Sequence, residues 1–84
     1  MRKQFDSCSY EELTSCIHAR VQWIREYRRF RNDPNTLQYG HIRADMIFKI
    51  LYCNREIKRL LKMRRVLKKS GLRNWDTDQL GDVV

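Results

Sequence analysis

The sequence has few cysteines, and their number is odd. Cys8, Cys16 and Cys53 are widely spaced along 84 residues, a pattern that does not match a disulfide framework. Cys53 stands within a run of apolar residues, so we expect it to be a small buried side chain. Cysteine usage of this kind favours a reducing, intracellular (cytoplasmic) setting.

The motifs of common catalytic and metal sites are also missing. The chain has no glycine-rich phosphate loop, no GxSxG motif, and no adjacent carboxylates apart from Glu11 and Glu12. Its cysteines and histidines show neither CxxC nor HxxxH spacing, and Cys16 and His18 would point about 200° apart on a helix. We therefore expect no enzymatic activity, no cofactor and no metal site.

Long apolar runs are absent too. The longest apolar-rich stretch, residues 46–53, is far shorter than the roughly 20 residues of a membrane-spanning helix and contains Lys49. The N-terminus carries Arg2 and Lys3 but lacks the apolar core of a secretory signal. We expect neither a transmembrane segment nor a signal peptide.

Acidic side chains are scarce in the middle of the chain. The net charge is +8, and residues 35–73 contain eleven basic side chains against two acids. Residues 74–84 reverse this balance, with three acids and no base. The basic excess favours association with a polyanion, which includes nucleic acid, an acidic protein surface and an anionic bilayer, without choosing among them.

Two helical patterns are present. Ser9 and Glu12 form a capping-box sequence, and the apolar positions that follow predict a first helix over about 10–32. Pro34 separates this helix from a second one, predicted over about 36–70 and ended by Gly71 in the left-handed conformation. Gly40 leaves the start of the second helix open between one long helix and a short helix followed by a kink.

These patterns predict an all-α two-helix hairpin. We assign residues 1–72 to a single helical domain. For the acidic C-terminal tail, residues 73–84, a helical turn from Asp76 and disorder both remain open.

The second helix is apolar on all sides between Ala44 and Cys53, and one neighbouring helix covers only one side. A chain this short buries roughly 60–65% of its unfolded surface. We therefore expect a second copy or another protein to complete the core, and favour a homodimer with a four-helix arrangement. The predicted interface residues are Ile47, Phe48, Leu51 and Tyr52.

Basic residues line one side of the second helix, opposite an apolar side. The apolar side contains Cys53, Ile57, Leu60, Leu61 and Leu67. The basic side is our first candidate for binding phosphates or another polyanion, with a solvated helix face as the alternative. Its residues are Arg55, Lys58, Arg59, Lys62, Arg65 and Lys69.

A second basic cluster near the end of the first helix is interleaved with aromatic residues. Arginine and aromatic side chains favour RNA, single strands or an acidic protein interface. The alternative is that the aromatic rings belong to the core. The residues of the cluster are Trp23, Arg25, Tyr27, Arg28, Arg29, Phe30 and Arg31.

These patterns favour a non-enzymatic module that binds nucleic acid, or a nucleoprotein complex, by reading backbone charge. The second hypothesis is a small inhibitor or adaptor, of the kind found in phages and mobile elements, that binds a protein of host nucleic-acid-handling machinery. The third is peripheral binding to an anionic membrane through the basic amphipathic stretch 57–69.

Overall fold

The computed structural model describes residues 4–83, which are mostly helical and contain no β-strand. This confirms the all-α class. Among the described residues, no helix is long and apolar enough to cross a membrane. The helices of residues 4–83 are α1 (Tyr10–Arg31), α2 (Pro34–Leu37), α3 (Gly40–Ser70) and α4 (Thr77–Leu80).

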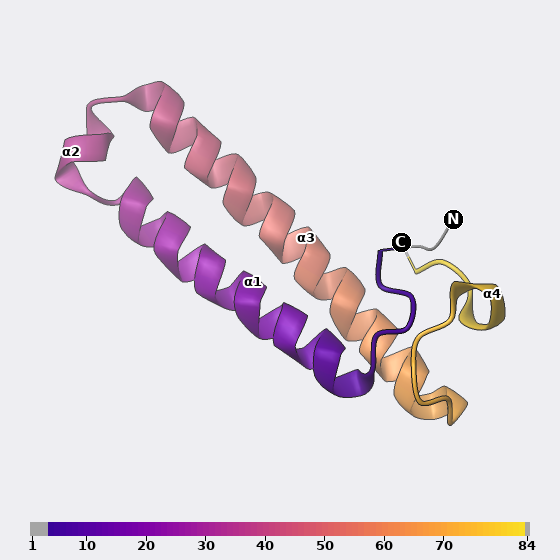
Figure 1. Ribbon diagram of the computed structural model, residues 1–84. Helices are drawn as coiled ribbons and strands as arrows, with labels where there is room; N and C mark the ends of the chain where they lie inside the picture. Colours follow the sequence, from indigo (N-terminus) through magenta and orange to yellow (C-terminus); the bar gives the residue numbers. More distant parts are fainter. Residues whose placement is uncertain (1–3, 84) are drawn as a thin grey trace.

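Helices α1 and α3 lie side by side and run in opposite directions, with the short α2 between them at one end (Figure 1). The N-terminal segment before α1 and the C-terminal segment with α4 both lie at the other end, beside the last turns of α3 (Figure 1). The molecule is elongated, with principal dimensions of 50 × 22 × 18 Å. One side of α3 therefore has no helix against it over much of its length.

Local hydrogen bonds explain where α1 begins and where α2 follows. The Ser9 hydroxyl accepts from the Glu12 amide at 3.2 Å, and the Glu12 carboxylate accepts from the Ser9 amide at 3.3 Å, which is the predicted capping box. After Arg31 the chain leaves the helix, and the Asp33 carboxylate accepts from the Asn35 amide at 2.8 Å to start α2.

Helix α3 begins later than the predicted second helix because α2 stops at Leu37 and the chain turns before Gly40. A short helix therefore precedes the long one. The other end matches the sequence: α3 ends at Ser70, and Gly71 has φ +76°, a left-handed conformation that costs glycine little. Leu72 then packs back on the apolar cluster that contains Leu67.

The core has two parts. The larger cluster lies between α1, α3 and both terminal segments, and the smaller one lies nearer α2. Leu13 and Leu60, which lie in the larger cluster, are fully buried. The larger cluster contains Phe5, Leu13, Ile17, Leu60, Met63, Leu67, Trp75 and Val83, and the smaller contains Ile24, Ile50 and Cys53.

The acidic C-terminal segment contributes to this core. Trp75 is 3% exposed, and Val83 is also buried. Two backbone hydrogen bonds hold the segment to the N-terminus, from the Ser7 amide to the Trp75 carbonyl (2.9 Å) and from the Trp75 amide to the Cys8 carbonyl (2.8 Å). The packed core therefore extends beyond residue 72, where the sequence analysis ended the domain.

Candidate functional site

Five of the exposed basic side chains along the C-terminal half of α3 share one side of the helix, and we call them the basic face. Steps of three or four residues keep them on one side of the helix, away from the buried Leu60 and Leu67. From first to last they extend over about 21 Å, at about 1.5 Å of helix per residue. The basic face consists of Arg55, Lys58, Lys62, Arg65 and Lys69.

Within residues 4–83 no carboxylate forms an ion pair with the basic face. The one acid of this stretch, Glu56, is buried and turned toward α1, where its carboxylate lies 3.9 Å from the Arg20 guanidinium. Two exposed ion pairs of the described residues lie elsewhere, between Arg29 and Glu26 and between Lys49 and Asp45. The charge of the basic face is therefore not offset by neighbouring carboxylates on α3.

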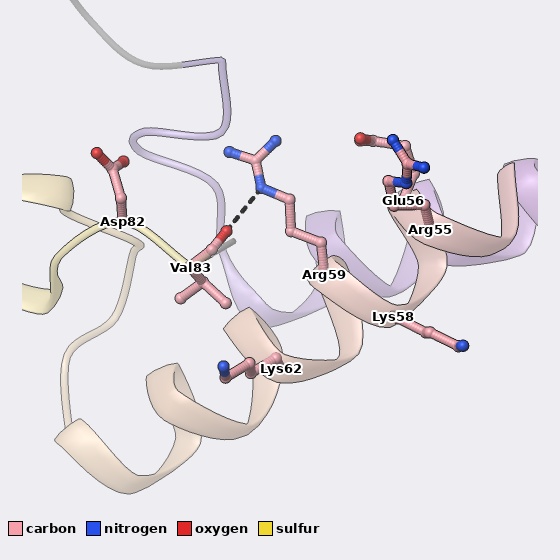
Figure 2. Close-up of a pocket in the computed structure, with 7 residues that line it drawn as sticks. All are labelled: Arg55, Glu56, Lys58, Arg59, Lys62, Asp82 and Val83. Atoms are coloured by element: carbon pink, nitrogen blue, oxygen red, sulfur yellow. Dashed lines mark hydrogen bonds between the residues drawn. The ribbon is translucent and has the colours of Figure 1, made fainter. Parts of the chain in front are cut away.

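Arg59, which the sequence placed with the basic face, makes contacts inside the fold. It is half-buried, its Nε donates to the Val83 carbonyl at 2.9 Å, and its guanidinium lies 5.6 Å from the centre of the Phe5 ring. Figure 2 shows Arg59 reaching the C-terminal segment, whereas Lys58 points away from that segment. Part of the Arg59 side chain therefore anchors the tail.

A hollow of about 630 Å³ opens between α3 and the end of the chain (Figure 2). Four of its lining residues are basic, and Asp82 and Glu56 place carboxylates at its margin. Neither carboxylate is free, because Asp82 takes part in another interaction and Glu56 is paired with Arg20. We call this space the basic hollow; it is lined by Arg55, Glu56, Lys58, Arg59, Lys62, Asp82 and Val83.

The second predicted cluster separates into two groups on the surface of α1. Trp23, Tyr27 and Phe30 follow helical spacing along one edge, whereas Arg25 and Arg29 are about 200° around the helix from Trp23 and Tyr27 respectively. Arg28 is exposed, and Arg31 is half-buried. The aromatic residues and most of the arginines, which are interleaved in the sequence, therefore lie on different sides of α1.

The aromatic edge of α1 meets two exposed rings of α3. Together they line a groove of about 350 Å³, which we call the aromatic groove. Phe48 is 70% exposed, Tyr52 62% and Trp23 47%, so much of the surface of these residues is open to solvent. The groove is lined by Arg20, Trp23, Tyr27, Phe48, Lys49, Tyr52 and Cys53.

Two cations lie against the rings of this groove. The Arg20 guanidinium is 5.6 Å from the centre of the Trp23 ring, and the Lys49 ammonium is 5.7 Å from the centre of the Tyr27 ring. Both distances fall in the range of cation–π contacts. The groove therefore combines aromatic rings with two cations, each of which is also paired with a carboxylate: Arg20 with Glu56 and Lys49 with Asp45.

The predicted interface residues fall into two pairs. Phe48 and Tyr52 line the aromatic groove, while Ile47 and Leu51 do not. Ile47 and Leu51 are also exposed, and their spacing of four residues places them on one side of α3. All four side chains are thus exposed, on two adjoining surfaces.

The apolar side of the second helix differs from the prediction at one position. Cys53, Leu60 and Leu67 are buried and Ile57 is half-buried, but Leu61 is 38% exposed. Met63 and Glu56 are buried in its place, because the line of contact with α1 shifts around α3 along its length. The sequence analysis also missed Trp75, which lies outside any helical pattern.

Two of the cysteines, Cys8 and Cys53, are held in the neutral thiol form. Burial raises the pKa of the Cys53 thiol, and burial together with the nearby Glu12 carboxylate raises the pKa of the Cys8 thiol. All three cysteines are free. Within the part of the chain that the structure describes, no group of three His, Cys, Asp or Glu side chains could hold a metal ion together.

Comparisons of the chain with family models, with curated proteins and with solved structures found no match.

Proposed function

We propose that this chain is a non-enzymatic module that binds nucleic acid, or a nucleoprotein complex, through the basic face of α3. The observation that supports this proposal is the row of five exposed cations, about 21 Å long, with no carboxylate of residues 4–83 paired to it. Lysine and arginine side chains in such a row neutralise backbone phosphates and release condensed counterions, which gives affinity without reading base sequence.

Charge reversal on the basic face tests the proposal. The double variant Lys62→Glu, Arg65→Glu should lose nucleic-acid binding at low salt and keep its helical signal, because both side chains are exposed. The matched control is Arg43→Glu, Arg73→Glu, which changes the net charge equally at two other exposed positions. If both double variants lose binding equally, overall charge rather than the basic face is responsible.

A protein partner is the second candidate. The exposed Ile47, Phe48, Leu51 and Tyr52 support it, because large apolar and aromatic side chains are concentrated at the centres of protein interfaces. In that case the chain would act as an inhibitor or adaptor of intracellular nucleic-acid-handling machinery. Partners that remain associated after nuclease treatment would favour this candidate over direct nucleic-acid binding.

We also propose that two copies associate through the surface that carries Ile47 and Leu51, pairing two α1–α3 hairpins in a four-helix arrangement. Burial of these exposed side chains supplies the driving force. Light scattering at micromolar concentration should give twice the chain mass of 10.3 kDa, and Leu51→Glu should give the single mass. A well-folded monomer of the parent chain would contradict the dimer.

A further inference from the structure

The aromatic groove and the basic hollow lie one after the other along α3. Phe48, Tyr52, Arg55, Arg59 and Lys62 are separated by three or four residues, which keeps them on one side of the helix. The first two line the groove, and the other three line the hollow. Together they form a track of about 21 Å, at about 1.5 Å per residue, with rings at one end and cations at the other.

The rings of the aromatic groove are accessible to a ligand. Trp23 and Tyr52 expose about half or more of their surface, and Phe48 exposes 70%. They come from two helices that pack on each other, so the core beneath them holds the two backbones that carry the rings side by side. Aromatic faces of this kind stack on bases of any sequence.

Charge complementarity indicates what occupies the track. Arg55, Lys58 and Lys62 bring exposed positive charge to the hollow. Beside the rings, Arg20 and Lys49 are each paired with a carboxylate, so the hollow supplies the charge that a ligand can neutralise. An apolar protein segment would gain little from these cations, whereas a nucleic-acid strand carries a phosphate with every base. In a duplex the base faces are stacked on each other, so only a single strand can use both the rings and the cations.

We propose that single-stranded nucleic acid is the ligand of this surface, with its bases stacked in the aromatic groove and its phosphates in the basic hollow. The inference rests on the proposed function and narrows it from polyanion contact to a substrate class. Ile47 and Leu51 lie outside the groove, so contact between copies uses different side chains from those that stack on bases.

A comparison of binding affinities tests this inference. The single-stranded ligands are oligothymidylate and oligouridylate of about 20 nucleotides, and the reference is a duplex of the same length at the same salt concentration. The single strands should bind at least about tenfold more tightly than the duplex. Phe48→Ala and Tyr52→Ala should each weaken single-strand binding by about tenfold and leave duplex binding unchanged. The matched control is Tyr39→Ala, which removes an exposed ring outside the groove.

Tryptophan fluorescence gives an independent readout. Trp23 is exposed and Trp75 is buried, so stacking should quench the Trp23 signal, and Trp23→Phe should abolish the quenching while preserving most of the affinity.

Three results would overturn the inference. Equal affinity for single strand and duplex, with no effect of the ring variants, would reject the groove as a binding site and leave the basic face as the proposed contact. Loss of single-strand affinity in Leu51→Glu to the same extent as in Phe48→Ala, with both variants monomeric, would assign the rings to contact between copies. Absence of any nucleic-acid binding at low salt would reject this inference and the proposed function together.

Discussion

Arg20 and Glu56 place opposite charges inside the α1–α3 interface. Their side chains are 12% and 11% exposed, and Arg20 also donates to the Cys16 carbonyl and lies over the Phe5 and Trp23 rings. Arg20 therefore connects the core to the aromatic groove. A buried charge that loses its partner is left with a desolvation cost that nothing offsets.

The variant Glu56→Gln should lower the free energy of unfolding by about 1–3 kcal/mol, because it leaves the Arg20 guanidinium buried without a counter-charge. Glu26→Gln is the matched control, since its partner Arg29 and Glu26 itself are mostly exposed, and it should cost well under about 1 kcal/mol. Urea unfolding measures both. Equal costs for the two variants would show that the buried pair contributes no more than a surface pair.

Cys53 provides a residue-scale test that depends on pH. Burial raises the pKa of its thiol above the ordinary value of 9.0, so the folded state favours the neutral thiol. The resulting stabilisation is present below pH 9.0 and is lost as the pH rises through the folded-state pKa. At pH 8, iodoacetamide should therefore modify Cys53 much more slowly in the folded chain than in urea. Equal rates, measured by mass spectrometry, would contradict its burial.

The two glycines at the ends of α3 should respond oppositely to substitution by alanine. Gly71 has φ +76°, where a side chain is strained, so Gly71→Ala should destabilise the protein by about 1 kcal/mol. Gly40 has open space around it, so Gly40→Ala should stabilise by up to about 1 kcal/mol through lower unfolded-state entropy. Thermal unfolding measures both. A destabilising Gly40→Ala together with a neutral Gly71→Ala would contradict the described helix ends.

Helix boundaries could be predicted from the sequence because they depend on neighbouring residues. The Ser9 capping box, the Asp33 cap and the left-handed Gly71 each involve side chains and backbone within a few positions. Burial along α3 was harder to predict, because it depends on how α1 crosses it. Periodicity alone therefore placed Leu61 inside and missed Met63.

At the scale of the whole molecule, contacts between distant segments could not be predicted. Trp75 is held by backbone hydrogen bonds to residues 7 and 8, and Thr77 donates from its amide to the Asp6 carboxylate at 3.1 Å. No local sequence pattern predicts a contact between segments about 70 residues apart. In addition, several acidic residues close to Trp75 are typical of a solvated tail. The core at this end therefore depends on both ends of the chain.

The candidate surfaces also differ in how well the sequence predicts them. The basic face lies on a single helix, and spacing alone located its five cations. The aromatic groove is formed by two helices, and the sequence assigned its rings to two separate groups, one on each helix. Likewise, the contact of Arg59 with Val83 depends on the path of the C-terminal segment, which periodicity does not describe.

The salt dependence of nucleic-acid binding tests the central claim most directly. Each duplex phosphate neutralised by the protein contributes about 0.9 to the slope of log affinity against log salt concentration, so five contacts from the basic face predict a slope of about −4 to −5. The neutral variant Lys62→Gln, Arg65→Gln removes two of these contacts without reversing charge, and should lower the magnitude of the slope by about 2. A parent protein that does not bind at low salt, or a slope that is the same in parent and variant, would contradict the account.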